Sequence, residues 1–77
     1  MKDLTEYIAR SLVDNPDEVL VDEIRRGNRV TLELHVAKED MGRVIGKGGR
    51  VANAVRTLLR VAAERDGSQV TLDVVEP

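Results

Sequence analysis

The chain has 77 residues, with 12 basic and 14 acidic side chains, a formal net charge of −2 and one aromatic residue, Tyr7. This length accommodates a single domain, residues 1–77, and the 42 % hydrophobic content predicts a folded core rather than disorder. The absence of cysteine excludes disulfides, thiolate metal sites and cysteine nucleophiles. No apolar run reaches the ~18 residues of a membrane helix, and the N-terminus does not resemble a signal peptide. We therefore expect a cytoplasmic protein without a membrane partner.

The first half of the chain predicts one helix followed by two strands. Residues 3–13 form an amphipathic helix that ends before Pro16, because the residue preceding a proline is disfavoured in helical geometry. Its apolar stripe consists of Leu4, Ile8 and Leu12. Residues 19–25 are rich in β-branched side chains, and residues 30–36 alternate strictly between apolar and polar. Gly27 and Asn28 lie between these two strands and predict a hairpin turn.

The second half predicts two helices and a last strand. A short helix begins at Glu39 and Asp40, with Met41, Val44 and Ile45 on its buried face. A longer helix extends from Arg50 to a stop at Gly67. Its apolar positions are Val51, Ala54, Val55, Leu58 and Ala62. Residues 70–75 alternate again, which gives the order α-β-β-α-α-β and a two-layer α+β domain with a three-stranded sheet. The last strand is reached through two helices and could pair in parallel with an earlier one.

Positive charge is concentrated in the middle of this acidic chain. Residues 1–40 carry a net charge of −4 and residues 61–77 a net charge of −3. Residues 41–60 carry +5 and contain no acidic side chain. A run of like charges is often only a solvated helix face. The residues inside the run therefore decide whether it binds an anion.

Those residues include Gly46-Lys47-Gly48-Gly49, which interrupts the helical pattern. A tight turn between two helices needs positive-φ residues, and this explains one or two of the glycines. A phosphate cradle explains all of them, because missing side chains let an anion approach the N–H groups at the start of the helix that follows. The spacing matches neither a P-loop nor a dinucleotide fingerprint. It does match a Gly-x-x-Gly loop between helices, which clamps a nucleotide backbone.

The stretch from Val44 to Arg50 resembles the signature of a KH domain, and the element order resembles the bacterial type II arrangement. The longer run from Glu39 to Arg50 is similar to the small stand-alone bacterial KH proteins of the KhpA (YlqC) family. The resemblance implies that single-stranded RNA lies in a groove between the two helices, the glycine loop and an edge strand. On this resemblance, Gly46, Lys47, Gly48 and Gly49 hold the sugar-phosphate backbone. Val44, Ile45 and Val51 form an apolar floor under the bases, and Arg43 and Arg50 add phosphate contacts.

The resemblance further implies a non-enzymatic RNA chaperone or post-transcriptional regulator without a cofactor or a small-molecule substrate. It implies a KhpB (Jag/EloR)-type partner and a role in cell elongation and envelope homeostasis. The alternative is a KH-like protein-interaction module that dimerises and has no intrinsic RNA binding. An enzyme of phosphate chemistry is a remote third reading, because we find no general base, nucleophile or metal cluster. The single histidine, His35, is expected on the polar face of its strand and not in a metal site.

Five of the six residues from 58 to 63 are apolar, more than one helix face can bury. With Leu58 and Ala62 expected in the core, three residues remain for a different surface. These are Leu59, Val61 and Ala63. They either pack against the sheet or the first helix, or form a self-association surface. The resemblance implies a homodimer or a pair with a second KH protein.

Overall fold

The computed structural model describes all residues from Met1 to Pro77 and confirms the predicted order of elements. The helices and strands are α1 (Lys2–Leu12), β1 (Leu20–Arg26), β2 (Arg29–His35), α2 (Met41–Ile45), α3 (Arg50–Asp66) and β3 (Gln69–Val75). Three short 3-10 turns lie between them, at Pro16–Glu18, Lys38–Asp40 and Lys47–Gly49. None of the helices combines the length and the hydropathy needed to cross a membrane.

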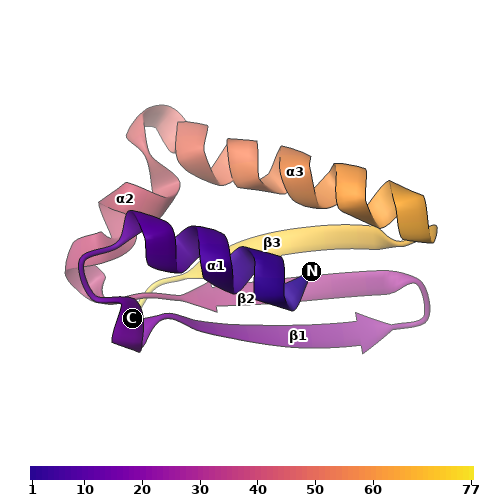
Figure 1. The fold of residues 1–77 in the computed structure, drawn as a ribbon, viewed down its shortest axis with the longest axis horizontal. Coiled ribbons are helices and arrows are strands. Elements are labelled where there is room, and N and C mark those ends of the chain that lie inside the picture. The colour runs from indigo at the N-terminus through magenta and orange to yellow at the C-terminus, as the bar shows by residue number, and fades with distance from the viewer.

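The three strands form one mixed sheet in the order β1-β2-β3. β1 and β2 are antiparallel and are joined at Gly27 and Asn28, where Gly27 has a φ of 60°. β2 and β3 are parallel, so the longer connection through α2 and α3 returns the chain to the same end of the sheet. All three helices cover one face, as Figure 1 shows, which confirms the predicted two-layer α+β architecture. One edge of β3 pairs with no strand.

The core lies between the sheet and the helices. The strict alternation of β2 is confirmed, because Val30, Leu32 and Leu34 are buried while Thr31 and Glu33 are only partly covered. Other buried hydrophobic residues of this core come from β1, β3 and the three helices: Ala9, Val21, Val44, Val55, Leu59 and Leu72. Most of them are small, which suits helices that pack close to a sheet.

Val55 of α3 is buried as predicted, but beyond it the face of the helix that enters the core differs from the prediction by one residue. Leu59 and Ala63 are fully buried, whereas Leu58 retains 55 % and Val61 49 % of its accessible surface. Adjacent residues of a helix point in directions 100° apart. The prediction therefore placed Leu58 in the core, whereas its neighbour Leu59 is the buried residue. Leu59 and Ala63 therefore cannot form a self-association surface, and of the three predicted residues only Val61 is exposed.

The same offset occurs on α1. Thr5 and Ala9 are the buried residues of this helix, while Leu4 and Leu12 from the predicted stripe stay partly exposed. The Thr5 hydroxyl is satisfied in its buried position, because it donates a hydrogen bond to the Met1 carbonyl at 2.9 Å. A small polar residue with a local partner thus takes the place expected of a leucine.

Asp40 joins the segment after α1 to the start of α2. Its buried carboxylate accepts hydrogen bonds from the backbone N–H of Asp14 at 3.1 Å and of Asn15 at 3.0 Å. It also accepts one from the Asn15 side-chain amide at 3.0 Å. Burial alone would raise the pKa of Asp40, but these hydrogen bonds and the nearby charge of Arg43 outweigh it and lower that pKa below 3.8. An ionised Asp40 therefore fixes where α2, and the loop after it, begins.

Candidate nucleic-acid interface

The glycine loop has a backbone that only glycine adopts readily. Gly46, Gly48 and Gly49 have φ angles of 76°, 66° and 78°. Gly46 also packs closely against α3, since a Cβ added there would lie 2.5 Å from Cγ2 of Val51. The geometry of the turn thus uses three glycines, one or two more than we expected from a turn alone.

The tip of the loop is open. Lys47 and Gly48 are exposed, and a Cβ added at Gly48 would meet no atom within 4 Å. Packing therefore leaves space at Gly48, unlike at Gly46. α3 begins directly after the loop with Gly49 as its N-cap, and no side chain caps its first N–H groups. The N–H of Arg50 donates to the carbonyl of Lys47. The positive end of the helix dipole favours an anion at this point, and the first turn contains no acidic residue.

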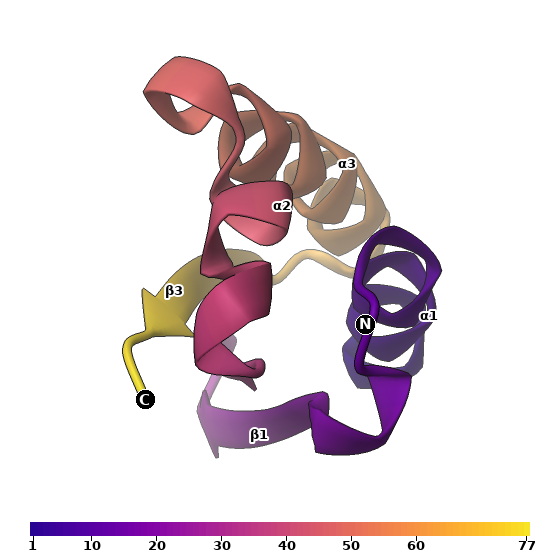
Figure 2. The same cartoon turned by 90° about the vertical axis from the view of Figure 1, so that its left-hand side faces the viewer.

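The basic side chains around the loop differ in whether they are already paired. Arg43 contacts Asp14 at 2.9 Å and Asp40 at 3.8 Å, so part of its charge is neutralised within the protein. Lys47 and Arg50 form no ion pair, and the same holds for Arg56 and Arg60 on α3. Unpaired positive charge therefore lies at the loop tip and along α3. Figure 2 shows that the loop between α2 and α3 lies on the opposite side of the molecule from α1.

The three predicted floor residues are covered to different degrees. Val44 is buried in the core, whereas Ile45 and Val51 are half-buried. Ile45 also lines a hollow beside the end of β3, together with Met41 and Pro77. Ile45 and Val51 can thus offer apolar surface next to the loop, and Val44 supports them from below.

Two basic residues near the edge strand were not among the predicted site residues. Arg56 donates from Nε to the Leu72 carbonyl at 3.1 Å and from Nη1 to Oδ1 of Asn53 at 3.1 Å. Arg60 lies one helical turn further along α3. Both line a cleft between α3 and β3, together with Leu59, Val70, Thr71 and Leu72. Both arginines belong to the acid-free run from 41 to 60, which the sequence analysis identified. That they lie beside β3 could not be predicted without knowing that β3 is an edge strand.

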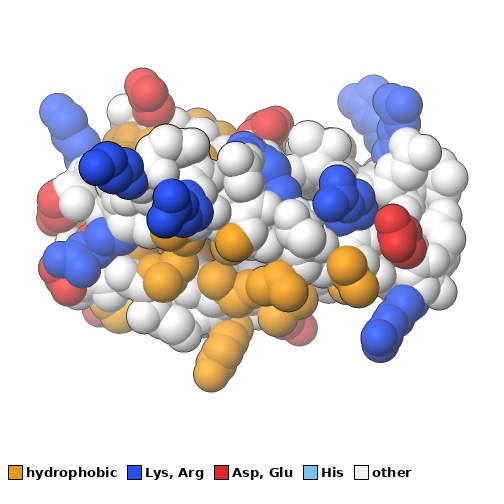
Figure 3. All heavy atoms as spheres, turned by 90° about the horizontal axis from the view of Figure 1, so that it is seen from above, with side chains coloured by type: hydrophobic (Ala, Val, Ile, Leu, Met, Phe, Trp, Pro, Cys, Tyr) orange, Lys and Arg blue, Asp and Glu red, His pale blue; other side chains and the backbone are white.

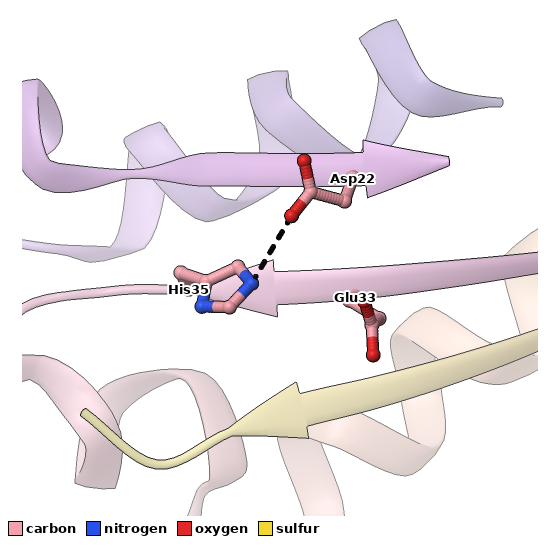
Figure 4. Close-up of side chains that lie close together, drawn as sticks. All are labelled: Asp22, Glu33 and His35. Atoms are coloured by element: carbon pink, nitrogen blue, oxygen red, sulfur yellow. Dashed lines mark ion pairs between the residues drawn. The ribbon is translucent and has the colours of Figure 1, made fainter. Parts of the chain in front are cut away.

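His35 lies on the polar face of β2, as predicted, and two carboxylates lie near it. Its Nε2 is 3.4 Å from Oδ2 of Asp22, and ligand atoms of Asp22, Glu33 and His35 lie within 4.8 Å of one another (Figure 4). The antiparallel register that places Asp22 opposite Glu33 brings the three together. They occupy the sheet face opposite the helices, so this cluster is separate from the glycine loop.

Comparison with known proteins agrees with this arrangement. A family model described as KhpA/KhpB, KH domain, matches residues 2–74. RNA-binding protein KhpA of Clostridium acetobutylicum is 51 % identical over 75 residues, which cover 97 % of this chain and 100 % of the relative. RNA-binding protein KhpA of Chlamydia trachomatis is 46 % identical over 76 residues, covering 99 % of this chain and 97 % of the relative. The chain therefore belongs to the KhpA/KhpB family of KH domains.

Proposed function

We propose that this chain binds single-stranded RNA at the Gly46–Gly49 loop and acts in the cytoplasm as an RNA chaperone or post-transcriptional regulator. The observation that carries the proposal is the set of unpaired cations around an open glycine loop at the start of a helix. The names of the relatives, RNA-binding protein KhpA, support RNA as the ligand.

In this proposal the loop binds the phosphates and the neighbouring apolar side chains contact the bases. The chain has one aromatic residue, and Tyr7 lies on α1, so stacking on aromatic side chains contributes nothing at the loop. Affinity then depends on phosphate contacts, each of which steepens the slope of log K against log salt by about 0.7 for a single strand. We expect weak, salt-sensitive binding with little preference for base sequence.

The test reverses the charge at the loop tip and at a matched position. Lys47→Asp/Gly48→Asp should abolish the mobility shift of an unstructured RNA. Arg65→Asp/Gly67→Asp changes the net charge equally at the far end of α3. Gly67 matches Gly48 closely, with φ of 71° against 66° and no atom near an added Cβ. The control should therefore retain RNA with a similar thermal transition. Equal RNA binding by both double variants would refute the site.

The exposed hydrophobic side chains of the helices support a second role, association with another KH domain. Leu4 and Tyr7 on α1 and Leu58 and Val61 on α3 are all more than 40 % exposed, and the two helices contact each other. We call these four residues the helix patch. Figure 3, which looks down on the helices, shows a band of hydrophobic side chains along the side where α1 lies. Such a patch is typical of an interaction site.

We infer that the helix patch binds a second copy of this chain or a KhpB (Jag/EloR)-type protein. In this proposal the complex acts in cell elongation and envelope homeostasis, the role that the family resemblance implies. Leu58→Glu should lower the mass measured by sedimentation to that of a monomer and prevent co-purification with the KhpB-type protein. Thr57→Glu, an exposed neighbour on the same helix, is the control and should change neither. A wild-type chain that stays monomeric and binds no KhpB-type protein would contradict this role.

A further inference from the structure

The uncovered face of the sheet carries a row of three carboxylates. Asp22 of β1 lies directly opposite Glu33 of β2, and Glu33 lies directly opposite Asp73 of β3. None of the three forms an ion pair with a lysine or an arginine. Like charges that face each other across a pair of strands destabilise a sheet. The row therefore favours a cation that the basic side chains of the protein do not provide.

His35 lies beside this row, and its Nε2 atom has no hydrogen-bond partner within the protein. Glu33 and His35 are two residues apart on β2, so their side chains leave the same face of the sheet. The Nε2 atom itself is buried, although 36 % of the side chain is exposed to solvent. Figure 4 shows Nε2 turned toward the carboxylate of Asp22. A buried nitrogen without a partner calls for a ligand that satisfies it.

The distance between two of these groups fits a shared metal ion better than a direct hydrogen bond. Nε2 of His35 lies 3.4 Å from Oδ2 of Asp22. A charge-assisted N–H···O bond would be about 2.7–2.9 Å long. Two ligands of a tetrahedral ion, each at about 2.0–2.1 Å from the metal, lie about 3.3–3.4 Å apart. Neighbouring ligands of an octahedral ion at the same bond length would lie only about 2.9 Å apart.

Glu33 can complete the set of ligands. Its carboxylate oxygen and the ligand atoms of Asp22 and His35 lie within 4.8 Å of one another. Glu33 forms no ion pair, so no such contact has to break when its side chain rotates toward the ion. The exposed part of the His35 ring leaves a path from solvent to the site.

We propose that Asp22, Glu33 and His35 bind a divalent transition-metal ion, and that the ion is tetrahedral Zn²⁺. One imidazole nitrogen and two carboxylate oxygens are ligands that Zn²⁺ accepts, and water takes the fourth position. The ion joins β1 to β2 on the face that no helix covers (Figure 1). The proposal departs from the expectation drawn from the sequence, because only the register of the sheet brings the two carboxylates to His35.

Calorimetric titration with Zn²⁺ tests the site in a chain prepared without a histidine tag. Wild type should bind one ion per chain, and His35→Gln should weaken this binding at least about tenfold. Glu33→Gln should weaken it to a similar degree. Asp73→Asn is the matched control, because it removes the same charge from the same row without removing a ligand. It should leave the Zn²⁺ affinity nearly unchanged, and all variants should melt like wild type in the absence of metal.

Two further measurements identify the ligand atom and the effect on the fold. Because His35 is the only histidine, the imidazole region of a nitrogen NMR spectrum reports on this ring alone. Zn²⁺ should shift the signal of Nε2 more than that of Nδ1. Zn²⁺ should also raise the melting temperature of wild type but not that of His35→Gln, because the ion binds only the folded chain.

The proposal is overturned if wild type and His35→Gln bind Zn²⁺ equally, since the ion then lies elsewhere. Equal losses in Glu33→Gln and Asp73→Asn would reduce the effect to a general attraction by the acidic row. A shift at Nδ1 in place of Nε2 would contradict the geometry. His35→Gln should bind RNA as tightly as wild type, so the metal site and the proposed RNA binding are tested separately.

Discussion

The two flanks of α3 differ in chemistry although they belong to one helix of 17 residues. The flank that faces β3 carries Arg56 and Arg60, and one of its arginines bonds to the strand edge. The flank beside α1 carries Leu58 and Val61, both about half exposed. Leu59 lies between them and is completely buried. A stretch that is simply apolar and basic in sequence thus becomes two surfaces separated by a core-facing stripe.

The two proposed roles, RNA binding and self-association, would therefore use one helix without sharing residues. Substitutions at well-separated positions usually have additive effects. Each flank can therefore be altered while the other serves as an internal control.

The largest effect is expected from the buried stripe between the flanks. Leu59→Ala should lower the free energy of unfolding by about 3 kcal/mol, because it leaves a cavity in a small core. Leu58→Ala, the same change on the neighbouring exposed residue, should cost about 0.5 kcal/mol or less. Urea denaturation of both variants measures the difference. Leu59→Glu should unfold the chain rather than produce a folded monomer. Equal losses at the two positions would show that the helix is rotated relative to our description.

The glycine loop packs against the first turn of α3. Substitution of Gly46 should therefore have the next largest effect on the free energy of unfolding. Gly46→Ala should lower the unfolding free energy by about 2 kcal/mol, since its φ of 76° and ψ of 168° belong to glycine alone. The new Cβ would also collide with Val51. Gly48→Ala should cost only about 1 kcal/mol, because its backbone is left-handed helical and the space around it is empty. Thermal denaturation with matched RNA titrations would separate folding from binding at each glycine.

The sequence predicted the elements well because each carries a local signal. Strict alternation predicted the strand at residues 30–36. Gly27 and Asn28 predicted the hairpin turn before it, and Gly67 predicted the end of the long helix. The buried face of α3 was wrong because Leu58 and Leu59 both fit helical spacing. Only the position of the helix between α1 and β3 decides which of them is buried.

The candidate site was predictable only in part for the same reason. The loop is contiguous in sequence and could be identified directly. The pairing of Arg43 with Asp14 joins residues 29 apart. The approach of Arg56 to Leu72 depends on β3 being an edge strand, which is a property of the assembled sheet. Contacts between distant segments thus set which cations remain unpaired.

The independence of the glycine loop and the helix patch can be tested by a reciprocal experiment. Lys47→Asp/Gly48→Asp should weaken RNA binding by at least about tenfold and leave self-association unchanged. Leu58→Glu should weaken self-association by about tenfold and leave the RNA affinity of the monomer unchanged. Fluorescence anisotropy measures the RNA affinity of each variant, and sedimentation equilibrium on the same samples measures its self-association. If Leu58→Glu also weakens RNA binding, the RNA site spans two chains, and the glycine loop and the helix patch are not independent.

The smallest effect concerns Asp40, which lies outside both flanks but sets where α2 and the loop begin relative to α1. Its pKa is lowered in the folded protein, so its ionised form stabilises the fold above its ordinary pKa of 3.8. That contribution should disappear as the pH falls from about 4 through the lower folded pKa. We expect the melting temperature to fall over this range and Asp40→Asn to reduce that fall while lowering stability at pH 7. Asp17→Asn, at an exposed and unpaired aspartate, should leave the pH profile unchanged. An identical acid profile in wild type and Asp40→Asn would mean that the hydrogen bonds from Asp14 and Asn15 do not depend on the charge. The anchoring of the loop would then have to come from the packing of Val44 in the core.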